Sequence, residues 1–259
     1  MPRPLTDLAD WTTIPAWPRV GCPECRIGTV GHEAVTQHLD AASRALVEQS
    51  RRDWNGPDEL SGPFSGTLAC DNHDCEARLV VAGDWAYSWD VDLTDGSAHL
   101  TDFYRVRFVL PPLRLFEPPA ATPSSVQAEI TASGVVVFAN PSAAGNRLRR
   151  AVEELLDAQR VRKTELRARR GKQVRERLSL HQRIELFGVR YPNVKDVLLA
   201  VKWIGNDATH GQEMTVADVL LCATVLEAAL RSLYDRSDAD LRALVSRINS
   251  QRGLGRRVG

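Results

Sequence analysis

The stretch PPLRLFEPPAATP, residues 111–123, holds five of the chain's 14 prolines and is the best linker candidate in the sequence. Proline fixes φ and lacks a backbone N–H, so this density disfavours both helix and sheet. Strand-like alternation precedes the stretch and helical periodicity follows it. A length of 259 residues has room for two modest domains. We therefore predict an α+β protein with domains at residues 1–122 and 123–259.

The net charge also changes sign at this boundary. Over the whole chain, 33 Lys and Arg balance 33 Asp and Glu. Residues 1–122 hold 10 basic and 18 acidic side chains, whereas residues 123–259 hold 23 and 15. The neutral total is thus a cancellation between an acidic and a basic half, and it does not exclude a nucleic-acid partner.

The sequence offers no membrane or export signal. It has no window of 18 apolar residues, so we expect no membrane partner. No apolar stretch follows Arg3, so we expect no secretory signal and a cytoplasmic location.

Four of the five cysteines lie in the acidic half as two short pairs, Cys22-Pro-Glu-Cys25 and Cys70-Asp-Asn-His-Asp-Cys75. Two such turns can converge as four thiolates on one tetrahedral Zn²⁺. A disulfide is disfavoured in a cytosolic chain, and a closed Cys₄ site leaves no open position for catalysis. We predict a structural zinc on these cysteines, with His73 as an alternative ligand. The β-rich module around them resembles the zinc ribbons and is short of a core of its own.

The remaining N-terminal elements follow from periodicity. Helical spacing predicts an inserted helix over residues 32–52, and clustered Gly and Pro predict a loop over residues 54–66. Residues 78–90 and 103–110 have the composition of strands. In the second of these we expect one apolar face, made of Tyr104, Val106 and Phe108.

The basic half is periodic with the spacing of helices. Apolar stripes and start signals predict helices over residues 124–138, 141–160, 179–187, 193–210 and 215–234, and a last one opened by Ser237. Ser124 with Gln127 is expected to form a capping box, and Ser179 with Gln182 and Thr215 with Asp218 are expected to open their helices. We predict an all-α helical bundle, with Cys222 as a buried core cysteine.

The segment KWIGNDATHG, residues 202–211, ends one of these helices. Gly205 permits close approach of a ligand or a second backbone. Asn206 and His210 stand four residues apart, so they share one face and could bind something together. The alternatives are that His210 caps the helix end and that Asn206 bonds a neighbouring helix.

This segment, with Arg150 and Glu154 on the helix upstream, resembles a bacterial HEPN-like family, the domain of unknown function family 4145. The resemblance covers roughly residues 112–235 and extends to the whole chain, because members often carry an N-terminal zinc ribbon. It implies an all-α HEPN-like bundle that forms a homodimer.

The same resemblance implies a possible activity. Active HEPN proteins are metal-independent ribonucleases with an Arg and a His in one motif. The catalytic His falls on His210 and the following Asn position on Asn206, but the Arg position falls on Gly205. Lys202, one turn earlier, could supply a cation, as a point charge without the planar fork of arginine.

A basic run joins two of the predicted helices, and its cations are Arg160, Arg162, Lys163, Arg167, Arg169, Arg170, Lys172, Arg175 and Arg177. Only Glu165 and Glu176 oppose them. Such a cluster predicts salt-dependent binding to RNA or DNA without sequence preference. The absence of aromatic residues argues against base stacking. The alternatives are a solvated helix extension and docking on the acidic half.

Three functions follow from these patterns. The first is a non-enzymatic or weakly enzymatic nucleic-acid-associated module, in defence against foreign nucleic acid. The second is a metal-independent ribonuclease using His210. The third is a dimeric adaptor whose two halves bind protein partners.

Overall fold

The computed structural model describes residues 3–53, 59–91, 96–169, 172–207, 213–235 and 246. Within them, the N-terminal half forms a curled antiparallel sheet in the order β1-β2-β3-β4-β5. Its strands are β1 (Val20–Gly21), β2 (Thr29–Gln37), β3 (Leu60–Cys70), β4 (Arg78–Val91) and β5 (Ala98–Leu110). A 3-10 helix, η1 (Leu5–Leu8), precedes the sheet, and α1 (Ala41–Asp53) connects β2 to β3.

The predicted helix over residues 32–52 is wrong in its first part. Residues 29–37 form β2, and α1 begins only at Ala41. Strand β2 is held by non-local pairing with β3, for example Val30 with Cys70 and Gln37 with Phe64. This pairing overrides the local helical spacing.

The predicted loop over residues 54–66 is also wrong from Leu60 on, because β3 begins there and runs through Gly62 and Gly66, whereas residues 54–58 lie outside the described residues. A Cβ at Gly62 would lie 1.9 Å from the carbonyl oxygen of His38, and one at Gly66 would lie 2.2 Å from that of Ala34. The glycines therefore permit close strand approach within the sheet rather than a turn.

The predicted apolar face of β5 is correct for Tyr104 and Val106, which are buried, but not for Phe108, which is 37% exposed. The register of β5 against β4 shifts at Arg107, which adds one residue to β5. A bulge of this kind reverses the alternation beyond it, so Val109 points inward instead.

The sheet has a substantial core of its own. Tyr104, Phe64 and Trp17 form a cluster of rings with centroids 5.3–6.0 Å apart. Leu68, Val81 and other strand residues are buried around it. The prediction of a zinc-ribbon-like module short of a core is therefore wrong, because these rings and strand side chains are buried within the sheet half.

The C-terminal half contains five helices among the described residues. They are α2 (Ser124–Val136), α3 (Pro141–Ala158), α4 (Leu180–Gly188), α5 (Pro192–Asp207) and α6 (Val216–Tyr234). Helix α3 contacts each of the other four. Its predicted inward face is buried and consists of Ala144, Leu148, Val152, Leu155 and Leu156. On α6, Cys222 is buried as predicted.

The prediction of an all-α HEPN-like helical bundle is wrong. Between α3 and α4, the basic run forms an antiparallel hairpin of β6 (Thr164–Arg169) and β7 (Lys172–Arg177). Like charges four residues apart repel on a helix. In the hairpin, by contrast, Arg167 reaches Glu165 at 2.6 Å and Glu176 at 3.5 Å.

Local helix signals were reliable where side-chain hydrogen bonds close the cap. Ser179 with Gln182 and Thr215 with Asp218 open α4 and α6 as predicted, and each pair forms a capping box. Ser124 does not, because Pro123 is the N-cap of α2 and no side chain caps it. The last predicted helix, from Ser237, lies outside the described residues.

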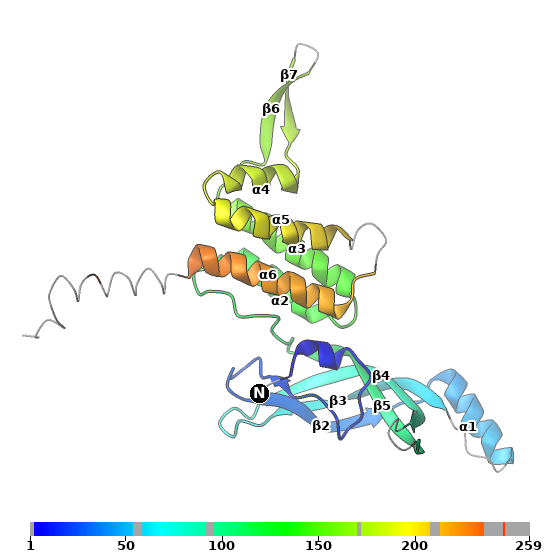
Figure 1. Cartoon of the computed structure of the whole chain (residues 1–259). Helices are drawn as coiled ribbons and strands as arrows, with labels where there is room; N and C mark the ends of the chain where they lie inside the picture. The colour runs from blue at the N-terminus through cyan, green and yellow to red at the C-terminus, as the bar shows by residue number, and fades with distance from the viewer. Residues whose placement is uncertain are drawn as a thin grey trace, which may run out of the picture.

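Residues 111–123 connect β5 to α2, and the predicted boundary at residue 122 lies just before α2. The helices lie on one side of the sheet, and the hairpin β6–β7 extends from their far end, away from the sheet (Figure 1). Among the described residues, no helix is long and apolar enough to cross a bilayer.

Candidate metal centre and basic hairpin

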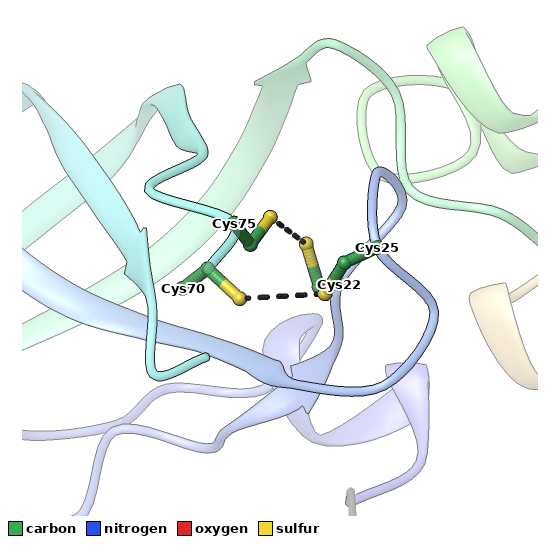
Figure 2. A group of neighbouring side chains, drawn as sticks. All are labelled: Cys22, Cys25, Cys70 and Cys75. Atoms are coloured by element: carbon green, nitrogen blue, oxygen red, sulfur yellow. Dashed lines mark hydrogen bonds between the residues drawn. The ribbon is translucent and has the colours of Figure 1, made fainter. Parts of the chain in front are cut away.

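Sheet topology brings the two cysteine pairs together. Cys22 and Cys25 lie in the turn from β1 to β2, whereas Cys70 and Cys75 lie in the turn from β3 to β4. Strands β2 and β3 are antiparallel neighbours, with Val30 paired to Cys70. The two turns therefore meet at the same end of the sheet, and their side chains point toward one another (Figure 2).

The four sulfur atoms have the spacing of a metal site. They all lie within 4.8 Å of one another, with Cys22–Cys75 at 3.9 Å and Cys25–Cys70 at 3.8 Å. Tetrahedral thiolates at about 2.3 Å from one zinc are about 3.8 Å apart. A disulfide requires about 2.05 Å, and all four cysteines are free. The cluster can hold a metal ion.

Both turns have the same backbone design. The residue after each second cysteine, Arg26 and Glu76, has positive φ of 62° and 51°. This left-handed residue turns the chain back toward the next strand. Backbone N–H groups then point at sulfur: Gly28 donates to Cys25 at 3.3 Å and Asn72 to Cys70 at 3.4 Å. Such donors stabilise thiolate charge.

The two turns are also joined directly. The Asp71 carboxylate accepts hydrogen bonds from the backbone N–H and the hydroxyl of Thr29, both at 2.6 Å. Arg19 lies 3.2 Å from the same carboxylate. At Gly28, a Cβ would lie 2.7 Å from Cys70 Sγ and 2.8 Å from Asp71 Oδ1, so only glycine fits between the turns.

The thiols differ in acidity. Backbone hydrogen bonds from Gly28 and Ile27 lower the pKa of Cys25 to about 6. Burial raises the pKa of Cys70 to about 12. Metal ligation requires deprotonated sulfur, so loading of this cluster releases protons.

Two other candidates lie apart from the cluster. The His73 side chain is 99% exposed and lies 3.6 Å from the carboxylate of Asp74, so it faces away from the sulfur atoms. Cys222 is fully buried in α6, and burial raises its pKa to about 12. Neither residue contributes to the metal centre.

The hairpin β6–β7 carries the basic run with two unlike faces. On one face, Arg167 is bound by Glu165 and Glu176. Arg175 and Arg177 belong to the other face, since side chains alternate along a strand. Both are exposed, and neither forms an ion pair within the described residues.

The remaining cations of the run are distributed around this hairpin. Arg160 is exposed at its base, Arg162 lies 3.4 Å from Glu165, and Lys163 lies 2.6 Å from Asp157. Strand β6 ends at Arg169 and strand β7 begins at Lys172, which are paired across the hairpin. Arg170 lies outside the described residues.

The predicted GNDATHG site is described only in part. Lys202 lies in α5 with 9% exposure, and its ammonium is 3.3 Å from the ring centroid of Trp203. The backbone of Asn206 belongs to the last turn of α5. His210 lies outside the described residues.

Two functional candidates carry no signal in the sequence, Arg149 and Arg183. They lie on α3 and α4, and both line a groove at the base of the hairpin. Arg183 occupies the first turn of the helix that Ser179 was predicted to open. No local pattern reveals that it lines the same groove as Arg149, 34 positions earlier.

Comparison with known families gives two matches. The model of a "Domain of unknown function (DUF4145)" matches residues 131–251, and that of a "Domain of unknown function (DUF8608)" matches residues 10–109. The predicted similarity to family 4145 is confirmed at this level. Neither description mentions a HEPN or zinc-ribbon relationship, so neither relationship is confirmed. No curated protein and no solved structure matches the chain.

Proposed function

We propose that this protein binds nucleic acid through the hairpin β6–β7 as a non-enzymatic or weakly enzymatic module. The observation that carries the proposal is the exposed hairpin face with Arg175 and Arg177, whose guanidinium groups have no acidic partner among the described residues. Arginine presents a planar fork of donors that suits phosphate oxygens. The two side chains follow one strand with a repeat of about 6.7 Å, which favours an extended backbone as ligand.

The position of the hairpin supports the same proposal. It extends away from the acidic N-terminal half (Figure 1). Its cations are thus not neutralised by that half in the same chain, as they would be if the basic run docked on it. A solvated extension of α3 is excluded by the strand geometry of residues 164–169 and 172–177.

The test is a charge reversal with a matched control. We expect Arg175→Glu with Arg177→Glu to weaken binding of a labelled single-stranded RNA or a DNA duplex at least tenfold at low salt. Two lost phosphate contacts also reduce the slope of log K against log salt by about 1.4 for single strands and about 1.8 for the duplex. Fluorescence anisotropy over a salt series measures both.

The control carries the same change of net charge in the other half. Arg44→Glu with Arg51→Glu alters two exposed side chains of α1. We expect this variant to bind within about threefold of wild type. Equal losses in both variants, or no binding by wild type at low salt, would contradict the proposal.

We also propose that the metal is a structural Zn²⁺ on Cys22, Cys25, Cys70 and Cys75. The sulfur spacing and the N–H donors at two of the sulfurs support it. Metal analysis of purified protein is expected to give one zinc per chain. The double variant Cys22→Ser with Cys75→Ser is expected to hold none, whereas Cys222→Ala retains it because Cys222 is buried in another element.

The ribonuclease alternative rests on His210 with Lys202 as the cation. Burial lowers the pKa of Lys202, and its ammonium stacks on Trp203, so it must leave this ring to reach a substrate. Cutting of RNA in the presence of chelator, abolished by His210→Ala, would favour this alternative.

A further inference from the structure

A groove of about 870 Å³ lies at the base of the hairpin, between α3, the two hairpin strands and the first turn of α4. Six cationic side chains line it: Arg149, Arg150, Lys163, Arg167, Arg177 and Arg183. The groove is thus continuous with the hairpin but is built on helices. A site on such rigid elements holds its side chains more firmly than an exposed strand does.

Two guanidinium groups of the groove have buried donors without an acceptor. Arg183 is 6% exposed; its Nη2 donates to Asp157 at 2.6 Å and to the carbonyl of Val161 at 3.2 Å. The Nε atoms of Arg183 and of Arg149 are both buried and have no hydrogen-bond partner among the described residues. Buried donors are normally satisfied, so these two guanidinium groups retain donor capacity that no acceptor in the described part of the chain uses.

The acidic side chains of the groove leave part of its positive charge uncompensated. Asp157 is already bound by Lys163 and Arg183, both at 2.6 Å, and Glu176 lies 3.5 Å from Arg167. The carboxylates of Asp157 and Glu176 therefore form their ion pairs with cations other than Arg149.

Arg149 itself forms no ion pair within the described residues. Burial, and then the charge of Arg149, lower the pKa of Lys202 on the neighbouring helix α5. Two cations thus lie close together here on α3 and α5, an arrangement that an anion would stabilise.

The groove also carries two carboxylates of α3, Glu153 and Glu154. They repel a ligand with several phosphates and can accept hydrogen bonds from N–H donors. A nucleotide unit combines one phosphate with base donors, and its size fits a groove of this volume.

We propose that this groove binds one nucleotide unit of the nucleic acid, with its phosphate on Arg149 and Arg183 and its base toward Glu153 and Glu154. The inference rests on the proposed function and deepens it. The hairpin face supplies salt-dependent contacts to the phosphate backbone of the nucleic acid, whereas the groove supplies a defined binding site for one nucleotide unit.

The experiment uses the full-length chain with three probes: adenosine and guanosine 5′-monophosphates, inorganic phosphate, and the labelled single-stranded RNA. Calorimetry is expected to show mononucleotide binding by wild type, with inorganic phosphate at least tenfold weaker. Arg149→Gln is expected to weaken mononucleotide binding more than tenfold. The control Arg147→Gln lies on the same helix but does not line the groove, so it stays within about twofold.

The variants separate this inference from the proposed function. The single variant Arg175→Glu is expected to weaken RNA binding and to keep mononucleotide binding within about twofold, since Arg175 does not line the groove. If wild type binds RNA but no mononucleotide, or if Arg149→Gln matches Arg147→Gln, the groove inference is overturned while the proposed function stands. If neither ligand binds, both fail. Equal melting temperatures show that the variants are folded; if Arg149→Gln is not, Arg149→Lys replaces it with the same expectation.

Discussion

Gly28 offers a sharp test of the metal centre, because a single methyl group placed there must enter the space between the two cysteine turns. A Cβ at this position would lie 2.7 Å from Cys70 Sγ and 2.8 Å from both Asn72 Cβ and Asp71 Oδ1. Ordinary contacts between such atoms are about 3.5–4.0 Å, so the turns must separate by about 1 Å. A zinc site tolerates changes of about 0.2 Å in its bond lengths.

The expected cost follows from this overlap. Overpacking of a tight site costs about 1–3 kcal/mol, which corresponds to a loss of about 5- to 150-fold in zinc affinity. Gly21 is the matched control, since a Cβ there meets nothing within 4 Å and its φ is not in the left-handed region. Gly21→Ala is expected to be neutral or to stabilise by about 0.4–1 kcal/mol, because alanine reduces the entropy of the unfolded chain.

Competition with a chromophoric chelator of known zinc affinity measures the difference at neutral pH. We expect Gly28→Ala to release zinc at a lower chelator concentration than Gly21→Ala and wild type, which should coincide. If Gly28→Ala held zinc as tightly as wild type, the inferred closeness of the two turns would be refuted. Equal weakening in both variants would refute the steric argument, because Gly21 has free space around it.

Two further predictions concern the helices. Leu148→Ala removes a fully buried side chain of α3 and is expected to cost about 2–5 kcal/mol in urea unfolding, whereas Leu221→Ala, at a position 58% exposed, should change stability by less than about 0.5 kcal/mol. Hydrogen bonds from the Thr215 backbone and hydroxyl lower the pKa of Asp218 in the folded state. Its stabilisation of α6 is thus present above the unfolded pKa and disappears as pH falls through the folded one. Asp218→Ala should cost about 0.5 kcal/mol at neutral pH and nothing in strong acid; a pH-independent difference would contradict the linkage.

The features that could be predicted from the sequence are those whose signal lies within a few neighbouring residues. The helix starts at Ser179 and Thr215 were predicted correctly, because all the hydrogen bonds of their caps lie within four residues. The cysteine pairs were predicted to converge because two short turns with thiols have few other uses in such a chain. Both signals depend on side-chain chemistry at fixed spacing.

The errors arose where distant segments decide the structure. Residues 32–37 have helical spacing but pair with β3, and Gly62 looked like a loop signal but serves close strand approach. The position of Phe108 depends on a bulge against β4, which the composition of β5 does not encode. Arg149 and Arg183 line one groove only because α3 and α4 contact each other in the fold.

The hairpin changes the meaning of the zero net charge. Residues 160–177 contain nine basic and two acidic side chains, yet the chain as a whole is neutral. The hairpin strands span about 20 Å, whereas exposed charges are largely screened beyond about 8 Å at physiological salt. Because the hairpin extends away from the acidic half, a phosphate backbone at its outer part experiences the local excess of cations rather than the cancelled total. The affinity of this protein for nucleic acid should accordingly follow substitutions in the hairpin, and substitutions that alter the net charge in the N-terminal sheet should leave it almost unchanged.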